Sequence, residues 1–380
     1  MEQNKRPVIA REDITPNYIR KIEQKIRAET TTWLFGLERP AELLVRSLFM
    51  RLPYNDKLTR SMKLAPPNIM FAGSTGIGKT ALIQSISFAV KAQERRIQGT
   101  PDLMPQDIIG SPTIVEDLKG NRTIQFKPGP IFNHLFFVDE ANRMRPQTGS
   151  ALIEAMEEHS ITPKNEYLAE EFAMKRLPLF PLSGKYDDVE GERFFMVLLT
   201  QNILDDEAGA FPNPMAVLDR ISMFIPIDRP PEEEERKIRA ENVEGKSIQP
   251  VTDLYEISAC ADWIHHNIKL SALADKYITK LLRNTDPDPR VTDTESELGR
   301  FLKEYVQVGA SPRVNYHLEA VARSETFFAG SNEVRPEHVK AVAKNVIVHR
   351  LILKPGKEFK TTKEEVFEEI LKKTEKPPWK

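Results

Sequence analysis

The spacing of apolar and polar residues changes along the chain at about residue 230. Before that point, short runs of consecutive apolar residues alternate with polar segments, and such runs are typical of strands buried on both faces of a parallel sheet. Beyond it, apolar residues recur only at helical spacing. The sequence therefore predicts an α/β fold followed by a smaller all-α part. The predicted strands are 68–72, 95–98, 135–138, 194–200 and 223–227.

Helical spacing and residues that favour helix starts predict the segments between and beyond these strands. The patterns divide the chain into an N-terminal arm and helix (1–32), an α/β domain (33–230) and a helical domain (231–380). The predicted helices are 17–32, 40–52, 79–90, 147–158, 215–220, 254–268, 271–284, 296–308, 312–327, 336–353 and 363–373.

Two insertions are predicted within the α/β domain. Near 111–128, two short runs of β-forming residues flank Lys119-Gly120-Asn121, which predicts a hairpin. Residues 158–193 form a longer segment ahead of the fourth strand, with an amphipathic helix predicted at 165–175.

Composition excludes several classes of protein. Of the 380 residues, 40% are hydrophobic and 29% are charged, which is typical of soluble globular proteins. The net charge of −2 provides no bulk attraction to nucleic acid or to anionic membranes. Cys260 is the only cysteine, which excludes an internal disulfide and a cysteine-rich metal site and indicates a reducing compartment. No apolar leader and no run of about eighteen apolar residues occurs, so we expect a cytoplasmic protein without membrane spans.

The segment after the first predicted strand fits the phosphate-binding pattern G-x-x-x-x-G-K-[ST]. Glycines allow a tight turn whose backbone N–H groups point at phosphate oxygens, and the positive end of the next helix adds to this attraction. Lys79 is expected to reach the β- and γ-phosphates, and the Thr80 hydroxyl to bind Mg²⁺. The alternative is a glycine-rich turn that binds no ligand. The nucleotide-binding candidates are Gly73, Ser74, Thr75, Gly76, Ile77, Gly78, Lys79, Thr80 and Ala81.

Two carboxylates follow the strand predicted at 135–138. Asp139 and Glu140 would lie at the carboxyl edge of the sheet, where open parallel sheets bind their ligands. Asp139 is then expected across from Thr80 as a second Mg²⁺ ligand. Glu140 is expected to orient or deprotonate the water that attacks the γ-phosphate. The alternative is an acidic turn that caps the next helix.

Two more candidates lie next to later strands. Asn202 follows the strand predicted at 194–200, and its neutral amide can hydrogen-bond both the γ-phosphate and the attacking water. Arg220 precedes the last strand, in a position from which an arginine could reach a neighbouring subunit. The alternatives are an asparagine that only forms a turn, and a surface salt bridge of Arg220, for example with Asp219.

Arg313 is a candidate phosphate contact at the start of a predicted helix. Ser311 is expected to cap this helix and Pro312 to occupy its first position. A cation in the first turn opposes the helix dipole at a cost of about 0.3–1 kcal/mol. A bound phosphate would offset this cost, and so would an acidic residue nearby.

Seven segments, in this order and at this spacing, are typical of one family. They are 99–108, 129–132, 139–143, 150–156, 200–202, 218–220 and 309–313. From about residue 33 to residue 371, the chain resembles the MoxR family of AAA+ ATPases. The resemblance implies a RecA-like αβα domain with a five-stranded sheet and an α-helical lid. It also implies a ring, usually a hexamer, that holds ATP between subunits.

The resemblance assigns roles residue by residue. Lys79 and Thr80 look like the Walker A pair, Asp139 and Glu140 like the Walker B pair, Asn202 like sensor 1, Arg220 like the arginine finger and Arg313 like sensor 2. Whether Arg220 or Arg143 acts on the neighbouring subunit stays open. The hairpin near 111–128 looks like the helix-2 insert, and 158–193 looks like an enlarged pre-sensor-1 segment.

The function implied by the resemblance is Mg²⁺-dependent hydrolysis of ATP to ADP and phosphate by a chaperone-like motor. Such motors remodel or help to assemble a protein client, often with a partner that carries a von Willebrand factor A domain. Two other functions stay open: a slow nucleotide-operated switch or scaffold that binds a partner protein, and a nucleic-acid-stimulated motor of the related helicase group. The nearly neutral net charge makes nucleic acid the less favoured partner.

Overall fold

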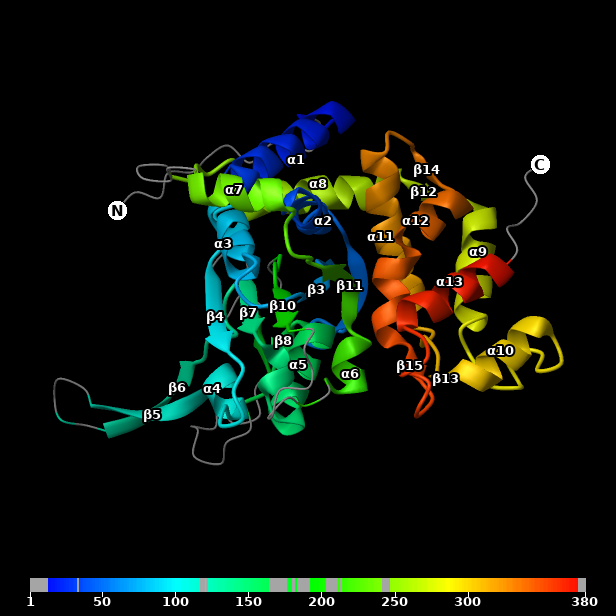
Figure 1. Ribbon diagram of the computed structural model, residues 1–380. Helices are drawn as coiled ribbons and strands as arrows, with labels where there is room; N and C mark the ends of the chain where they lie inside the picture. The colour runs from blue at the N-terminus through cyan, green and yellow to red at the C-terminus, as the bar shows by residue number, and fades with distance from the viewer. Residues whose placement is uncertain are drawn as a thin grey trace.

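A sheet of five parallel strands forms the centre of the molecule (Figure 1). This computed structural model describes residues 13–32, 34–116, 120, 122–163, 176–179, 182, 192–202, 211, 213–240 and 247–374. The five strands were all predicted from the sequence, with small differences at their ends. They are β3 (Asn68–Ala72), β4 (Glu94–Gln98), β7 (Leu135–Asp139), β10 (Met196–Gln201) and β11 (Ile221–Pro226).

The order of the strands brings several loops together at one edge of the sheet. In space the strands follow the order β11, β3, β10, β7 and β4, and every neighbouring pair is parallel. All residues of β3 and β7 are buried, as their unbroken apolar runs predict for strands covered on both faces. The register pairs Gln98 with Asp139 and Gln201 with Ala72, so the segments after these strands are neighbours.

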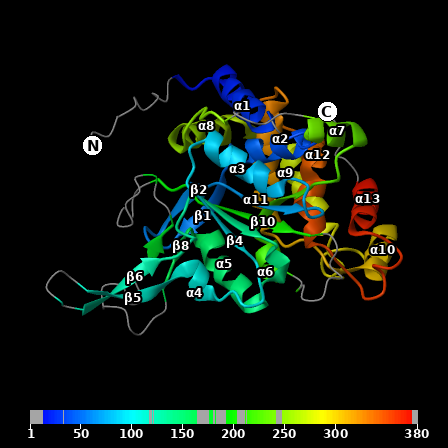
Figure 2. The same cartoon turned by 60° about the vertical axis from the view of Figure 1, so that its left-hand side comes forward.

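Helices cover both faces of the sheet (Figures 1 and 2). Ile69 and Phe71 of β3 pack with Leu82 of α3 in one apolar cluster, whereas Met70 packs with Leu152 of α5 in a second cluster. Successive residues of a strand point to opposite faces, so β3 contributes to both clusters. The helices of this part are α1 (Pro16–Thr31), α2 (Glu38–Ser47), α3 (Lys79–Ala89), α4 (Pro105–Ile109), α5 (Pro146–Glu158), α6 (Met215–Leu218) and the 3₁₀ turn η2 (Ala141–Arg143).

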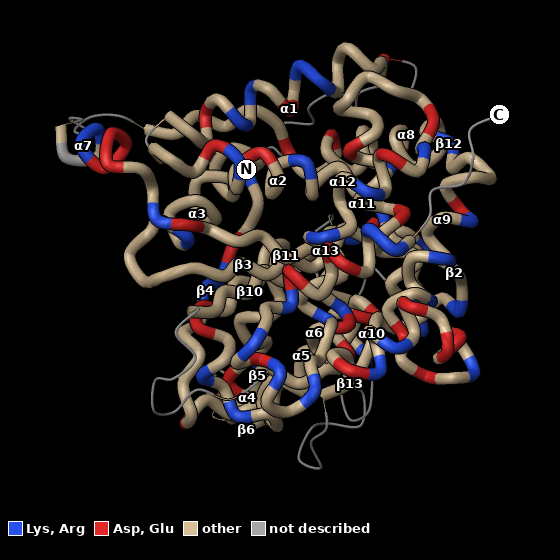
Figure 3. Tube along the Cα trace, turned by 45° about the vertical axis from the view of Figure 1, so that its right-hand side comes forward, with Lys and Arg blue, Asp and Glu red and all other residues tan. Residues whose placement is uncertain are grey.

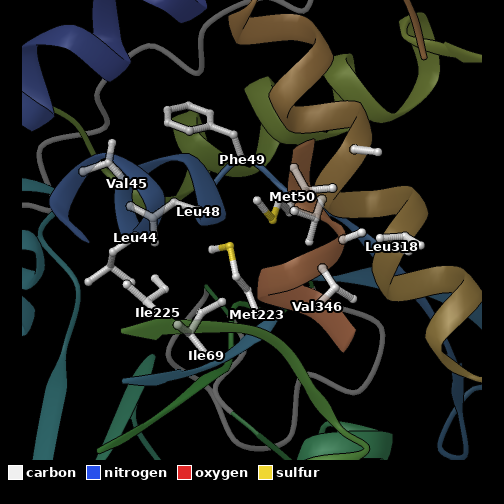
Figure 4. Packing of buried hydrophobic residues seen from close by; sticks show 14 of the residues in the cluster. Leu44, Val45, Leu48, Phe49, Met50, Ile69, Met223, Ile225, Leu318 and Val346 are labelled. Atoms are coloured by element: carbon white, nitrogen blue, oxygen red, sulfur yellow. The ribbon is translucent and has the colours of Figure 1, made fainter. Parts of the chain in front are cut away.

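The C-terminal helices pack directly against the β11 edge of the sheet. Ile69 of β3 and Met223 of β11 belong to the same apolar cluster as Met50, Leu318 and Val346 (Figure 4). One continuous core therefore joins the sheet to the helical part. The helices of this part are α7 (Glu232–Ala240), α8 (Leu254–Asn267), α9 (Ala272–Arg283), α10 (Glu297–Tyr305), α11 (Val314–Phe328), α12 (Pro336–Ile347), α13 (Lys363–Lys373) and the 3₁₀ turn η3 (Val348–Arg350).

Five short pairs of strands lie outside the central sheet in the described part of the chain. The predicted hairpin near 111–128 is confirmed as the antiparallel pair β5 and β6, which projects from the body of the molecule (Figure 1). The other four pairs were not predicted, because each is short and depends on a partner distant from it or on a polar turn. The pairs are β1 (Leu52–Asp56) with β2 (Ser61–Ala65), β5 (Gly110–Glu116) with β6 (Arg122–Pro128), β8 (Ser160–Ile161) with β9 (Leu177–Pro178), β12 (Lys269–Leu270) with β14 (Glu333–Val334), and β13 (Val306–Val308) with β15 (Ile352–Leu353).

Two expectations about the helical part were wrong. We expected no strands beyond residue 230, but the pairs β12–β14 and β13–β15 tie its loops together. The helix predicted at 336–353 stops at Ile347, and the chain then forms η3 and β15. Apolar residues continue through this stretch because it stays buried, so spacing alone did not mark the end of the helix. The helix predicted at 165–175 lies outside the described residues.

Charged residues of both signs are interspersed along the described chain (Figure 3). This distribution agrees with the net charge of −2 and leaves no extended stretch of one sign that would attract nucleic acid in bulk. Within the described part of the chain, no helix is both long enough and apolar enough to cross a membrane.

Two buried histidines predict a loss of stability in mild acid. Burial lowers the pKa of His134 to about 4, and burial with a smaller effect of Arg193 lowers the pKa of His159 to about 3. Both imidazoles are neutral in the folded protein but take up protons in the unfolded chain below pH 6.5. The free energy of unfolding is therefore expected to fall by about 2 kcal/mol per histidine between pH 6.5 and pH 5.

Chemical denaturation at a series of pH values measures this effect. His134→Asn keeps an acceptor for the backbone N–H of Gln93, which donates to Nδ1 of His134 at 3.0 Å, and should remove the part of the pH dependence that His134 contributes. The exposed His266 offers a matched control, because His266→Asn should leave the profile unchanged. A wild-type free energy of unfolding that is the same at pH 6.5 and pH 5 would contradict this prediction.

Candidate functional site

The glycine-rich segment forms a turn between the carboxyl end of β3 and the first residue of α3. Gly76 and Gly78 have φ angles of 79° and 87°, which residues with side chains rarely adopt. A Cβ atom on Gly73 would lie 2.3 Å from the carbonyl oxygen of Ile227, so no side chain fits there. The turn delivers the chain into α3, whose first residue is Lys79, with the free backbone N–H groups of a helix start exposed toward the loop. This conformation suits an anionic phosphate.

The Lys79 side chain turns back over this loop. Its ammonium donates to the carbonyl oxygens of Gly73 at 2.5 Å and Ser74 at 3.0 Å, and to Oδ1 of Asn202 at 3.2 Å. Burial lowers the pKa of Lys79, while the nearby carboxylates Asp139 and Glu140 raise it. The structure thus brings together Lys79, at the start of α3, and Asn202, directly after β10.

Asp139 lies at the centre of a polar cluster at the same edge. Its Oδ2 accepts from the Thr80 hydroxyl at 3.4 Å and from the Arg96 guanidinium at 2.6 Å, and its Oδ1 accepts from the Thr200 hydroxyl. A hydroxyl and a carboxylate oxygen facing each other are donors of the kind that a hard divalent cation takes. Thr80 and Asp139 therefore fit the expected pair of metal ligands.

Glu140 follows with a backbone conformation that is unusual for its residue type. Its φ of 53° is left-handed, and its N–H donates to the Thr200 hydroxyl at 3.0 Å. Gln98 donates to its Oε2 at 2.8 Å, Asn202 donates to its Oε1 at 3.3 Å, and Nε of Arg143 lies 3.2 Å from Oε2. Strained conformations of this kind cluster at functional sites. Three contacts hold the carboxylate beside Lys79 and Asp139 rather than at the start of α5, which argues against a simple helix cap.

Arg220 and Arg313 lie at the opposite edge of the sheet. Arg220 directly precedes β11, whose first residue pairs with Asn68, the first residue of β3. The phosphate loop follows the last residue of β3, so the length of a five-residue strand, roughly 15 Å, separates the two edges. Arg143, in contrast, contacts Glu140 at the carboxyl edge. Neither Arg220 nor Arg313 joins the cluster around Lys79 in the same chain.

Glu157, near the end of α5, holds both arginines. Arg220 donates from Nε to Oε2 of Glu157 at 3.1 Å, and Arg313 donates from Nη2 to Oε1 at 2.7 Å. The predicted alternative of a salt bridge for Arg220 thus names the wrong acid, because the Asp219 carboxylate instead accepts from the Ser311 hydroxyl at 2.6 Å. Both arginines line an open cleft of about 830 Å³.

The expected cap of α11 was wrong. The Ser311 hydroxyl does not bind the free N–H groups of the helix, which begins at Val314 with Arg313 as its N-cap residue and without a side-chain cap. The Ser311 hydroxyl is engaged by Asp219 across the boundary between sheet and helices. The unfavourable position of Arg313 near a helix start is offset by Glu157, the nearby acid that the sequence left open as an alternative.

Comparisons with known proteins agree with this arrangement. Residues 68–175 match the family described as "ATPase family associated with various cellular activities (AAA)", and residues 301–370 match the AAA lid domain. Chaperone MoxR1 of Mycobacterium tuberculosis is 28% identical over 331 residues, which cover 84% of this chain and 78% of that protein. Protein MoxR of Paracoccus denitrificans is 27% identical over 340 residues, which cover 84% of this chain and 90% of that protein.

The fold comparison extends over nearly the whole chain. The crystal structure of a proposed ATPase from Cytophaga hutchinsonii superimposes with a TM-score of 0.75 at 26% sequence identity, covering 96% of this chain and 97% of that one. The chain is a MoxR-like AAA+ ATPase. Its parallel sheet and flanking helices form the RecA-like AAA+ fold, and its C-terminal helices form the lid. Similarity to this ATPase family indicates that the chain binds a nucleotide.

Four residues of the site were missed in the sequence. Arg96, Gln98 and Thr200 contact the two carboxylates, and Glu157 holds the arginines. For Arg96 and Gln98 a signal existed, because residues two apart on a strand share a face. Their partners could not be inferred, because β4 pairs with β7 rather than with β3, its predecessor in the chain.

Proposed function

We propose that this ATPase hydrolyses ATP with Mg²⁺ in a ring of identical subunits and that hydrolysis drives the remodelling or assembly of a protein client. The observation that carries the proposal is the separation of the candidate residues between two edges of one sheet. Lys79, Asp139 and Glu140 meet at the carboxyl edge, whereas Arg220 and Arg313 lie together at the amino edge. Each subunit can bind the phosphates itself and offer its arginines to a neighbour.

The phosphate-binding half of the site consists of the glycine-rich loop and Lys79. The ammonium now bound to two loop carbonyls and to Asn202 would move to the β- and γ-phosphates, because these anions offer a stronger partner than neutral oxygens. Thr80 and Asp139 would hold Mg²⁺, which neutralises charge on the phosphate oxygens. Arg96 shares Oδ2 of Asp139 with Thr80 and would have to yield part of that contact.

The hydrolytic half consists of Glu140 and Asn202. Both side chains lie within one hydrogen-bonded group, with Nδ2 of Asn202 donating to Oε1 of Glu140 at 3.3 Å. Glu140 would orient the attacking water and accept its proton, and Asn202 would hold the water against the γ-phosphate. Gln98 and Arg143 fix the other carboxylate oxygen and so limit the orientations that Glu140 can adopt.

The two arginines would complete the site of the next subunit in the ring. Arg220 is the proposed arginine finger and Arg313 the proposed sensor 2, both acting on the nucleotide of a neighbour. Head-to-tail contacts between identical subunits close into rings, and a hexamer is the ring we propose. In the isolated subunit both guanidinium groups pair with the single carboxylate of Glu157, so assembly would have to exchange this carboxylate for phosphate oxygens.

The client is proposed to be a protein. This part of the proposal rests on similarity to a relative named as a chaperone. A partner with a von Willebrand factor A domain is proposed from the family resemblance of the sequence alone. The projecting β5–β6 hairpin exposes Ile114 and Ile124 on neighbouring positions of one face, which suits contact with an unfolded or flexible protein segment. The proposed location is the cytoplasm, which agrees with the single, buried cysteine.

Steady-state phosphate release tests the proposed reaction. ATP hydrolysis should require Mg²⁺, stop on addition of EDTA and rise with a protein client. A basal rate too slow to sustain turnover, and unchanged by any client, would instead favour the switch or scaffold function. A rise in rate on addition of single- or double-stranded DNA would favour a nucleic-acid motor, for which the nearly neutral charge offers no support.

Thr200→Val is expected to weaken the dependence of nucleotide binding on Mg²⁺. The hydroxyl of Thr200 bonds both the Asp139 carboxylate and the Glu140 N–H, so its loss frees a proposed metal ligand to rotate. Loss of such a supporting group typically costs about 10–100-fold in metal affinity. A Mg²⁺ titration of nucleotide fluorescence measures the shift.

A second buried threonine provides the matched control for Thr200→Val. Thr148 donates to the carbonyl oxygen of Leu103 at 2.6 Å, away from the carboxyl edge of β7 and β10. Thr148→Val should leave the midpoint of the Mg²⁺ titration unchanged. Equal midpoints for Thr200→Val and wild type would show that Thr200 does not support the metal site.

A further inference from the structure

A buried arginine of the lid binds the backbone on both sides of Arg220. Arg350 lies in η3, and its side chain is only 1% exposed. Its Nη2 donates to the carbonyl oxygen of Asp219 at 3.1 Å and also to that of Ile221, while Nη1 donates to the carbonyl oxygen of Val346. One guanidinium therefore connects α12 of the lid with the residue before Arg220 and the residue after it.

Burying this charge is costly, and the surroundings only partly offset the cost. Burial lowers the pKa of Arg350 to about 9, and the Asp219 carboxylate, 3.9 Å from Nε, opposes that shift. An apolar side chain of similar length would avoid the desolvation penalty. An apolar side chain would lack the planar set of N–H donors of the guanidinium, which holds two carbonyl groups at a defined distance from each other.

Other lid residues bind the same short segment. The Ser311 hydroxyl donates to Asp219, and Nε2 of His349 lies 3.2 Å from the carbonyl oxygen of Ile221. The side chain of Arg220 itself points elsewhere, toward Glu157 of α5 and the carbonyl oxygen of Ala216. The lid thus contacts the segment on both sides of Arg220. The α/β part holds the Arg220 side chain, and Asn68 of β3 donates to the carbonyl oxygen of Arg220 at 3.3 Å. A displacement of the lid relative to the sheet would be transmitted to Arg220 through the backbone.

We propose that Arg350 is a positioning residue for Arg220. Through Arg350, the lid controls the position of the Arg220 guanidinium that is offered to the neighbouring subunit. The inference deepens the proposed function and rests on it, because it takes Arg220 to act in catalysis. Because the Arg350 side chain is only 1% exposed, its proposed role is indirect, through the backbone around Arg220.

The test variant is Arg350→Lys, which keeps the charge. A lysine ends in one ammonium group and cannot bind both carbonyls with the geometry of a guanidinium. A catalytic group displaced by about 1 Å can lose on the order of 10²-fold in rate. We therefore expect kcat to fall by about 10²-fold while nucleotide affinity, measured with a fluorescent ATP analogue, stays within about twofold of wild type.

A second lid arginine supplies the matched control. Arg323 of α11 also binds two backbone carbonyls, those of His265 and Ile268, but these lie in α8 and its C-cap rather than beside Arg220. Arg323→Lys should therefore carry a similar structural penalty and leave kcat near the wild-type value. A comparable loss of kcat in both variants would mean that damage to the lid, and not the position of Arg220, explains the effect of Arg350→Lys.

A double-mutant cycle decides whether Arg350 acts through Arg220. If it does, adding Arg350→Lys to Arg220→Ala lowers kcat no further than Arg220→Ala alone. Multiplicative losses, or a single Arg350→Lys variant with wild-type kcat, would overturn the proposal. If Arg350→Lys does not fold, Ser311→Ala removes a different lid contact to the same segment, and its smaller loss of kcat should likewise vanish in the Arg220→Ala background.

Mixing subunits separates this inference from the proposed function. Arg350→Lys subunits keep an intact phosphate loop, so adding Lys79→Ala subunits, which carry a well-placed Arg220, should restore turnover. Adding Arg220→Ala subunits should not. If Arg220→Ala is rescued by Lys79→Ala but Arg350→Lys is not, the positioning role is wrong. If neither Arg220→Ala nor Arg350→Lys is rescued, the proposal that Arg220 acts on a neighbouring subunit is wrong. The double-mutant cycle alone then tests the role of Arg350.

Discussion

Replacing Arg220 with alanine is expected to lower kcat by about 10³–10⁵-fold while ATP stays bound. The reason is its place in the fold. Arg220 precedes β11 at the amino edge of the sheet, far from Lys79 of its own chain, and therefore contributes nothing to the binding of phosphates in cis. Its charge would meet the γ-phosphate only across a subunit boundary, where it stabilises charge that develops during transfer. Steady-state phosphate release and a nucleotide titration measure the two quantities.

A neighbouring arginine provides the control for this variant. Arg176 forms an ion pair with Glu158, next to Glu157 on the same helix, and Arg176→Ala removes a comparable contact without touching Arg220. Both variants should assemble and fold as wild type does, because Glu157 keeps Arg313 as a partner when Arg220 is removed. Turnover by Arg220→Ala within about tenfold of wild type would rule out the finger role.

Glu140→Gln is expected to bind ATP and to hydrolyse it about 10²–10⁴-fold more slowly than wild type. Glutamine has the shape of glutamate, and its one carbonyl oxygen can replace Oε2 as the acceptor for Gln98, so the site should keep most of its geometry. It cannot accept a proton from water, and chemistry should therefore stop after binding. Rapid quenching of the enzyme after incubation with ATP should recover intact ATP from the protein.

The outcome that would contradict this role is a loss of nucleotide binding in Glu140→Gln. Such a loss would mean that the carboxylate mainly supports the fold of the loop after β7. Glu94 serves as the control, since it lies at the start of β4 and accepts from the Ser87 hydroxyl at 2.8 Å, away from the carboxyl edge. Glu94→Gln should hydrolyse ATP at close to the wild-type rate.

The central sheet could be predicted from the sequence because its strands are buried on both faces. Segments such as 68–72 and 135–138 contain almost only apolar residues, and turns or polar residues bound them sharply. The residues at their carboxyl ends then follow by position, since parallel strands present those ends at one edge. Lys79, Asp139 and Asn202 meet there for this reason.

Contacts between segments distant in the chain could not be predicted. The sequence offers several acids near Arg220, and only folding brings Glu157 of α5 to both Arg220 and Arg313. Ser311 matches the local pattern of a helix cap, but its hydroxyl donates to Asp219 of the α/β part, and α11 begins later, at Val314. The β1–β2 hairpin was not predicted, because its strands are only partly buried and its turn is charged.

Mixing two inactive variants addresses the sharing of the site between subunits. Lys79→Ala lacks the phosphate-binding ammonium but keeps Arg220, and Arg220→Ala has the reverse defect. In an equal mixture that assembles at random, about a quarter of the interfaces join an intact loop to an intact Arg220. We predict that each variant alone is nearly inactive and that the mixture recovers a corresponding fraction of wild-type turnover. If mixed rings form but hydrolyse ATP no faster than either variant alone, an ATP site shared between two subunits is contradicted.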